Sequence, residues 1–322
     1  VLALDFPKQG TGDDHEWQVA VDSLIAAHAN HPKTCAVISN LSELMPENAR
    51  QRLAKAGIAP LQSLKDGVAA LARLVRYGER RRQVAAMDDP EQLLLRGPLL
   101  VEGESKMLDE WASKQLVGRY GLQLPGGRCV SKADVVEAAN EVGYPVVMKG
   151  VSDRLAHKTE AGAVMLNLKD GSAVASAVEV MAGRLAEQGL ADARFLIEPM
   201  ISDFVGELII GLKRDEQFGL ALIIGTGGIL VNLLNDSAIV LLPITREAAS
   251  TAVLSLKGSA LLRGFRGRPE GDLEAVVDAI MAVADFAMDH WDSVTELDIN
   301  PLMVRPKGKG AVAADALIRL QQ

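Results

Sequence analysis

A lysine and a histidine lie close together in the sequence, separated by a short polar stretch. The apolar run Gly143-Tyr-Pro-Val-Val-Met-Lys149 is typical of a buried strand that ends in a lysine, and His157 follows on the polar segment Ser152–Glu160. A lysine held by a strand can neutralise a nucleotide phosphate, and a histidine nitrogen can accept a phosphoryl group and pass it on. The pair therefore predicts phosphoryl chemistry. Two plainer interpretations stay open, because strand-end lysines often reach the surface and loop histidines are often simply solvated.

Oxygen-bearing side chains alternate along a second segment, Glu296-Leu-Asp298-Ile-Asn300-Pro301. Since successive side chains of a strand point to opposite faces, we expect Glu296, Asp298 and Asn300 on one face and the leucine and isoleucine between them on the other. Mg²⁺ prefers a few protein oxygens, completed by phosphates and water. The pattern therefore suits a magnesium ion that bridges nucleotide phosphates.

Glycines interrupt the most apolar part of the chain, Phe218 to Leu234, at the sequence Gly225-Thr-Gly-Gly228. This interruption predicts two strands joined by a turn and argues against a membrane span. Glycines let backbone N–H groups approach an anion, although a turn between strands favours glycine in any case. The segment is not a dinucleotide-binding fingerprint, because the third glycine and the following helix are missing.

Composition narrows the class of protein. The chain has 322 residues, 48% of them hydrophobic, which is enough for two or three domains with their own cores. Its 34 basic and 42 acidic residues give a net charge of -8, and aromatic residues are only 4%, so nucleic acid is not expected as a partner. Cys35 and Cys129 lack metal-site spacing and favour free thiols, and no signal peptide is visible. We therefore expect a cytoplasmic protein without a membrane partner.

The order of apolar and polar runs predicts three regions. Residues 1–80 alternate short strands with helices, which indicates a small parallel α/β layer of three strands. Residues 81–105 are polar and predict a linker. Residues 106–322 show two successive groups of expected helices and strands, at about 106–195 and 196–322, which we call α+β lobes. Periodicity alone gives only a mixed α/β protein.

Individual elements can be expected by residue range. The first region should contain strands Val1–Phe6, Thr34–Ser39 and Ile58–Leu61 and helices Glu16–Ala29, Pro46–Ala56 and Leu64–Tyr77. In the lobes we expect helices Glu104–Tyr120, Ser131–Val142, Ser172–Gln188, Thr245–Leu256 and Asp272–His290. The expected strands are Pro145–Val151, Ala163–Leu168, Arg194–Pro199, Gly206–Lys213, Phe218–Ile224, Ile229–Leu234, Ile239–Leu242, Ser293–Val304 and Ala311–Ala314.

Nearly the whole chain resembles the nucleotide-binding part of the NDP-forming acyl-CoA synthetases, of the ADP-forming acetate–CoA ligase type. This is a branch of the ATP-grasp superfamily related to the β subunit of succinyl-CoA synthetase. The resemblance implies an ATP-grasp domain at 106–322, preceded at 1–80 by the C-terminal part of a flavodoxin-like CoA-ligase domain. Its landmarks, in order, are Gly143–Lys149, His157-Lys-Thr, Glu198-Pro-Met, Gly206–Gly219, Gly225–Gly228, Gly264–Pro269 and Glu296–Pro301.

The resemblance also implies roles for these residues. His157 matches the second phosphoryl carrier of the family, on a loop thought to swing between the CoA side and the nucleotide, and Lys149 matches a lysine that contacts nucleotide phosphates. The backbone of Glu198, Pro199 and Met200 matches the hinge that reads the base.

Further matches concern the ribose, the phosphates and the metal. Glu207 would bind ribose hydroxyls or help to hold the metal, unless it is simply a strand-surface glutamate, and Gly227 and Gly228 would approach the phosphates. Asn300 and Asp315 match the Mg²⁺ ligands, with Asp298 beside them. Alternatively, Asp315 could cap a helix that begins at Ala316.

Three positions depart from the family pattern. Asn232 stands where a glutamate is usual, Asn235 where a lysine is common, and Val240 where a polar residue is common. Loss of the glutamate could slow or abolish catalysis.

The implied reaction is acid + CoA + ATP ⇌ acyl-CoA + ADP + phosphate, run through an acyl phosphate and phosphohistidines, with ATP/ADP, Mg²⁺ and CoA as ligands. We expect this chain to supply the nucleotide step. The CoA-binding Rossmann and ligase domains and the first phosphohistidine would come from the same polypeptide or another subunit, so this chain alone should not make acyl-CoA. The sequence starts with Val1 in place of an initiating Met, which also suggests that it is part of a longer polypeptide.

Other outcomes stay open. A homo-oligomer is compatible with the sequence. The alternative function is a non-catalytic ligand-sensing module of the kind fused to protein-lysine acetyltransferases, and a third is an ATP-grasp ligase of another specificity.

Overall fold

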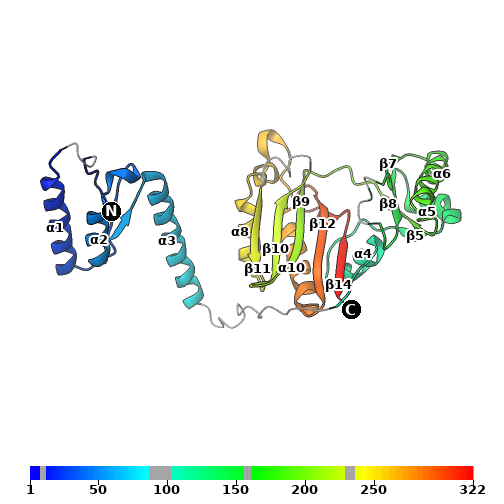
Figure 1. Ribbon diagram of the computed structural model, residues 1–322. Coiled ribbons are helices and arrows are strands. Elements are labelled where there is room, and N and C mark those ends of the chain that lie inside the picture. The colour runs from blue at the N-terminus through cyan, green and yellow to red at the C-terminus, as the bar shows by residue number, and fades with distance from the viewer. Residues whose placement is uncertain (8–11, 87–102, 156–157, 159–160, 229–235, 322) are drawn as a thin grey trace. The chain divides into compact units, whose positions relative to one another are not determined.

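The computed structural model describes residues 1–7, 12–86, 103–155, 158, 161–228 and 236–321. The chain divides into two compact units, Val1–Pro90 and Glu91–Gln322 (Figure 1). The division falls within the stretch 81–105 that we predict as a linker, although the preceding helix extends farther than expected, to Ala85.

The first unit is a parallel three-stranded sheet with helices between its strands. Its strands β1 (Leu2–Ala3), β2 (Ala36–Ile38) and β3 (Ala59–Leu61) lie in the order β1-β2-β3. Its helices are α1 (His15–Asn30), α2 (Glu47–Lys55) and α3 (Leu64–Ala85), with a short 3-10 turn η1 (Ser42–Leu44). Phe6, Val21, Val37 and Leu53 form much of its core. The parallel alternation is as predicted, but β1 is shorter than the expected Val1–Phe6.

The second unit contains a four-stranded antiparallel sheet. Its strands β5 (Arg128–Val130), β6 (Val146–Val151), β7 (Val164–Leu168) and β8 (Arg194–Pro199) lie in the order β5-β8-β6-β7. Helices α5 (Val135–Val142) and α6 (Gly171–Glu187) pack on one face, against Met148 and Ile197. Because side chains alternate along a strand, Val147, Lys149 and Glu198 point from the opposite face.

A seven-stranded antiparallel sheet forms the rest of this unit. Its order is β11-β10-β9-β12-β14-β4, and β13 also pairs with β12. Helices α8 (Arg246–Ser255) and α10 (Leu273–Asp289) cover one face with a continuous apolar core (Figure 1). The strands are β4 (Ser105–Met107), β9 (Gly206–Asp215), β10 (Gly219–Thr226), β11 (Ser237–Leu241), β12 (Val294–Val304), β13 (Ala311–Ala313) and β14 (Leu317–Gln321).

Shorter helices connect these layers. Helix α4 (Glu110–Gly118) lies next to β14, and α9 (Ser259–Leu262) follows α8. Two 3-10 turns, η3 (Lys132–Asp134) and η4 (Phe265–Gly267), complete the described elements.

Several expected elements are wrong in detail. The helix expected from Glu104 begins only at Glu110, because residues 105–107 pair with β14 as strand β4. The helix expected from Ser131 starts as the 3-10 turn η3, and strands β5 and β14 were not predicted. The lobe boundary expected at 195/196 falls inside β8, which pairs with β5 and β6. The expected strand Ile229–Leu234 lies outside the described residues.

Within the described ranges, no helix is both long and apolar enough to cross a membrane.

Two glycines of the second unit give a stability prediction with opposite signs. A Cβ on Gly127 would lie 2.4 Å from the backbone oxygen of Ile197, whereas a Cβ on Gly183, inside α6, would meet nothing within 4 Å. We expect Gly127→Ala to destabilise the unit by about 1–3 kcal/mol through overpacking against backbone. Gly183→Ala should stabilise it by about 0.5–1 kcal/mol, because alanine favours a helix interior. Urea unfolding of both variants measures the two effects, and equal shifts would contradict the packing around β8.

Candidate functional site

A buried carboxylate at the start of α4 gathers three lysines. Glu110 opens the helix, after Asp109, whose side chain accepts a hydrogen bond from the Ala112 N–H at 2.8 Å. The Glu110 side chain is only 1% exposed, and its Oε1 lies 2.7 Å from Lys149 Nζ and 2.8 Å from Lys114 Nζ. Its Oε2 accepts from Lys158 Nζ at 2.5 Å. One carboxylate therefore holds three ammonium groups.

A second carboxylate and a carbonyl complete this arrangement. Glu198 lies 2.6 Å from the Lys114 ammonium and 2.9 Å from that of Lys149. The Ala314 carbonyl oxygen accepts from the same two lysines, at 2.6 Å each. Each of these ammonium groups thus has three acceptors for its three N–H bonds. We call Glu110, Lys114, Lys149, Lys158 and Glu198 the lysine cluster.

The lysine cluster is assembled by local geometry and by strand pairing. Lys114 follows Glu110 by four residues, so the two side chains share one face of α4. In the register of β6 and β8, Val147 pairs with Glu198 and Lys149 with Leu196, which puts Lys149 and Glu198 on one face of the sheet. Ala314 precedes β14 of the other sheet. The cluster therefore ties the two sheets of the second unit together.

Mutual attraction opposes the effect of burial on the charges of Glu110 and Lys149. Burial alone would raise the pKa of Glu110, but Lys149, Lys114 and Lys158 outweigh it and lower that pKa from 4.5 to about 2. Burial opposes the charge of Lys149 as well, yet Glu110 and Glu198 raise its pKa. Lys114 behaves differently, since burial and repulsion from Lys149 lower its pKa.

A cavity of about 240 Å³ opens beside the cluster, between the helix-free face of the four-stranded sheet and β12. Six of the predicted site residues line it, namely Lys149, Glu198, Pro199, Met200, Asn300 and Asp315. The remaining lining is mostly apolar and comes from Pro125, Val147, Val164, Leu166, Ile201, Pro301, Met303 and Ala314. The cavity thus has an apolar wall and a charged end.

The predicted metal ligands come from β12 and from the short segment between β13 and β14. Leu297 and Ile299 are buried while Asp298 and Asn300 are not, which confirms the expected alternation. Burial raises the pKa of Asp298 and the nearby Asp315 carboxylate adds to the rise, while a hydrogen bond with Asn300 opposes it. Two mutually repelling carboxylates and an amide form a donor set that fits Mg²⁺, which needs few protein oxygens.

The surroundings of Asp298 and Asp315 differ. In the described part of the chain, no three His, Cys, Asp or Glu side chains form a metal-binding group. Asp298 is not among the residues that line the cavity. The Asp315 carboxylate is 30% exposed and is paired with Lys158 at 2.6 Å.

Two backbone groups that we expected to face a ligand already have partners. The Met200 N–H donates to the Pro145 carbonyl at 2.9 Å, so it is not free to read a base. The Gly227 N–H donates to the Glu207 carbonyl at 2.7 Å. A Cβ on Gly227 would lie 2.9 Å from Glu207, so this glycine permits the close approach of the turn to β9.

Other expected residues lie apart from the cavity. Glu207, Gly227 and Gly228 are not in its described lining. Glu207 is half-buried against the glycine turn, since a Cβ on Gly228 would lie 3.4 Å from its Oε2.

Some predictions fall outside the description or are corrected by it. His157, Asn232 and Asn235 lie outside the described residues. Val240 lies in β11 and packs against the core of the seven-stranded sheet, which suits its apolar side chain. The proposed helix after Asp315 is wrong, because residues 317–321 form β14 between β12 and β4.

Sequence reasoning missed Glu110, Lys114 and Lys158 as site residues. The Glu110–Lys114 spacing was visible, but on a helix such a pair is usually a solvated one. What makes it different is burial by Lys149, Glu198 and Ala314, from elements that are far away in the sequence.

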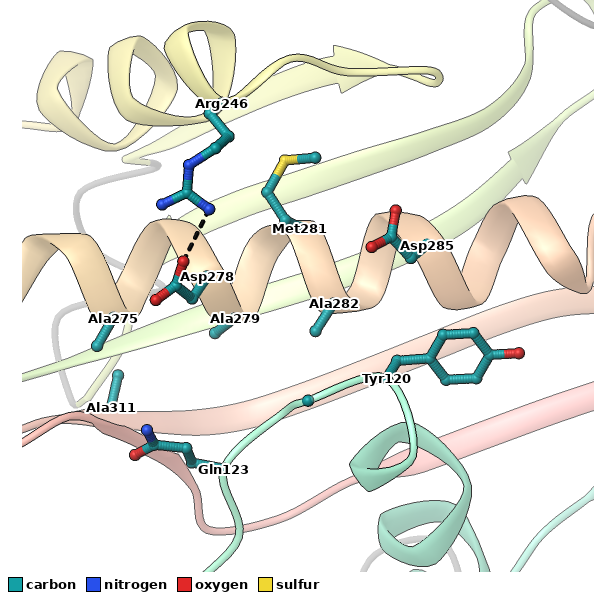
Figure 2. Close-up of a pocket in the computed structure, with 11 residues that line it drawn as sticks. Tyr120, Gln123, Arg246, Ala275, Asp278, Ala279, Met281, Ala282, Asp285 and Ala311 are labelled. Carbon is teal, nitrogen blue, oxygen red and sulfur yellow. Dashed lines mark hydrogen bonds and ion pairs between the residues drawn. The ribbon is translucent and has the colours of Figure 1, made fainter.

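A second cavity, of about 300 Å³, lies along α10 (Figure 2). Its most prominent charged pair, Arg246 with Asp278, is 2.7 Å apart, and the two side chains are 50% and 64% exposed. None of the predicted site residues lines it. The candidate site is therefore the first cavity.

The lysine cluster predicts a strong effect for the loss of one charge. Glu110→Gln would leave three buried ammonium groups with two carboxylates, Glu198 and the partly exposed Asp315. We expect the change to cost about 3–5 kcal/mol of unfolding free energy. Glu179→Gln is the matched control, because Glu179 pairs with Lys132 at the exposed surface. That change should cost less than about 1 kcal/mol. Equal losses in urea unfolding would mean that the cluster does not stabilise the unit.

The stability of the wild-type chain should also depend on pH in a defined window. The pKa of Glu110 is lowered from 4.5 to about 2, so its contribution is fully present above pH 4.5 and is lost as pH falls through 2. The stability difference between the wild type and Glu110→Gln should therefore shrink between these two values. A difference that stays constant in urea unfolding over this range would contradict the lowered pKa.

Comparisons with known proteins identify the family of the second unit. Residues 100–320 match the family model described as an ATP-grasp domain. The chain is 36% identical to the β subunit of acetate–CoA ligase [ADP-forming] II of Pyrococcus furiosus, over 72% of this chain and 98% of the relative. It is 30% identical to an acetate–CoA ligase [ADP-forming] of Methanocaldococcus jannaschii, over 91% of this chain but 43% of that one. The chain thus spans nearly all of a separate β subunit and less than half of a single-chain ligase.

A solved structure shows the same relationship. Acetyl-coenzyme A synthetase 1 of Ca. Korarchaeum cryptofilum, in complex with coenzyme A and Ca-AMPCP, is 31% identical and has a TM-score of 0.62 over 67% of this chain and 94% of its own. Another structure of that synthetase holds Mg-AMPPCP, with a phosphohistidine segment that points towards the nucleotide-binding site. These ligases support the enzyme interpretation over the non-catalytic alternative. The chain belongs to the ATP-grasp domain family and, within it, to the ADP-forming acyl-CoA synthetases.

Proposed function

We propose that the second unit binds Mg²⁺ and ATP or ADP in the cavity beside the lysine cluster and moves a phosphoryl group between the nucleotide and His157. This is the nucleotide step of acid + CoA + ATP ⇌ acyl-CoA + ADP + phosphate. The observation that carries the proposal is that Lys149, Asn300 and Asp315, together with Glu198, line one cavity whose remaining lining is apolar.

The apolar wall suits a base and a ribose. Val147, Val164 and Leu166 come from the four-stranded sheet, and Met303 comes from β12. A flat purine placed between them would remove apolar surface from water on both of its faces. Since the Met200 N–H is already bonded, recognition of the base edge falls to other groups of the segment 198–201.

The charged end suits phosphates. The lysine cluster contains three ammonium groups and two carboxylates, and Asp315 balances the remaining positive charge. When Asp315 is engaged by a divalent cation, one positive charge is left to face the phosphates from a poorly solvated position. Interactions in such a position are stronger than in water, and phosphoryl transfer depends chiefly on them.

Asn300 and Asp315, with Asp298 beside them, would hold Mg²⁺. When bound, the ion would neutralise charge on the phosphate oxygens. Lys149 fixes the Ala314 carbonyl and therefore the backbone at Asp315. In the forward direction a nitrogen of His157 attacks the γ-phosphorus, the N–P bond forms, and the bond to the ADP oxygen breaks.

The complete reaction needs further parts. The CoA-binding Rossmann and ligase domains, which would carry most of the acyl and CoA specificity, belong to the same polypeptide or to another subunit. The relatives occur in both arrangements, as separate β subunits and as longer chains. A cytoplasmic location, a flavodoxin-like origin of residues 1–80 and self-association are parts of this proposal that rest on the sequence.

The proposal predicts a phosphorylated protein. With Mg²⁺ and γ-labelled ATP, the purified chain should acquire protein-bound label that is acid-labile and base-stable, as phosphohistidine is. His157→Ala should acquire none, while it binds Mg²⁺–ADP as tightly as the wild type. His31→Ala, in the first unit, is the matched control and should be labelled normally. Label that persists in His157→Ala, or a wild type that binds nucleotide but gains no label, would count against the assigned carrier.

A further inference from the structure

Lys158 lies between two carboxylates with different surroundings. Its Nζ is 2.5 Å from Glu110 Oε2 and 2.6 Å from Asp315 Oδ1. Glu110 is 1% exposed and is shared with two other lysines. Asp315 is 30% exposed, lines the cavity, and has Lys158 as its salt-bridge partner within the described residues. Lys158 therefore pairs with one buried carboxylate and with one that lines the cavity.

Asp315 is also the residue to which we assign the metal. A carboxylate oxygen 2.6 Å from an ammonium group is occupied by a cation. A divalent ion that coordinates the same carboxylate would lie close to that ammonium and repel it. The Asp298 carboxylate lies near that of Asp315. Its negative charge would reduce the repulsion between the ammonium group and the divalent ion but would not remove it.

We infer that Lys158 is a tethered cation that occupies Asp315 before the metal and nucleotide bind, and that Lys158 and the divalent ion compete for this carboxylate. This inference rests on the proposed function, because that proposal makes Asp315 a metal ligand. Lys158 is thus a positioning residue for the nucleotide step. When the contact between Lys158 and Asp315 breaks, the contact with Glu110 keeps Lys158 in the lysine cluster.

Competition has a reciprocal consequence. If Lys158 weakens metal binding by some factor, metal binding weakens the docking of Lys158 by the same factor. Binding of the metal nucleotide would therefore weaken the contact between Lys158 and Asp315.

The first test measures the metal without the reaction. Mn²⁺ binding to the full chain is titrated by electron paramagnetic resonance, for the wild type and for Lys158→Met. We expect Lys158→Met to bind Mn²⁺ at least about fivefold more tightly, at the lower end of usual coupling between sites. Lys132→Met, which breaks the exposed pair with Glu179, is the matched control and should not change the affinity. In an Asp315→Asn background, Lys158→Met should have no effect.

The second test needs no variant, so it stays decisive if Lys158→Met does not fold. Lysines of the wild type are acetylated with an N-hydroxysuccinimide ester, and the modified sites are quantified by mass spectrometry with and without Mg²⁺–ADP. Acetylation of Lys158 should rise severalfold on addition of Mg²⁺–ADP, whereas that of Lys132 should not change.

The outcomes separate the two claims. If Mg²⁺–ADP binds but neither the Mn²⁺ affinity of Lys158→Met nor the acetylation of Lys158 changes, the competition is refuted and the proposed function stands. If the wild type binds no metal nucleotide at all, the proposed function fails and the inference fails with it.

Discussion

The buried ionic contact between Glu110 and its three lysines is the constraint on which the second unit depends. Moving one ion from water into a protein interior costs roughly several kcal/mol of free energy, unless other charges and hydrogen bonds compensate for it. Glu110 in α4, Glu198 in β8 and the Ala314 carbonyl between β13 and β14 supply that compensation. The cluster is therefore stable only while α4, the four-stranded sheet and the residues before β14 stay together.

This constraint explains how the site is positioned. The two sheets each have their own apolar core, and neither core reaches across the cavity. The lysine cluster joins them and sets the position of Asp315 relative to Lys149, through the Ala314 carbonyl. A contact with balanced charges suits a site that must accept phosphates and a metal ion. When a ligand binds one charged group of the cluster, the electrostatic interactions of the other groups change as well.

The sequence predicted the features that follow from local pattern. Alternation placed Asp298 and Asn300 on one face of β12, and the apolar run before Lys149 gave the strand β6. It did not predict that Lys149 is satisfied by Glu110 and Glu198, because these partners are 39 and 49 residues away and come from other elements. The short segments β4 and β14 were missed for a similar reason, since β4 is a strand only through its pairing with β14, and β14 through its pairing with β12 and β4.

The most direct measurement of the central claim is a crystal structure of the chain with Mg²⁺ and a non-hydrolysable ATP analogue. Our account predicts the base against Val147, Val164 and Leu166, the phosphates directed to the lysine cluster, and the metal on Asn300 and Asp315. A nucleotide bound outside this cavity, or a metal that leaves Asp315 untouched, would contradict it.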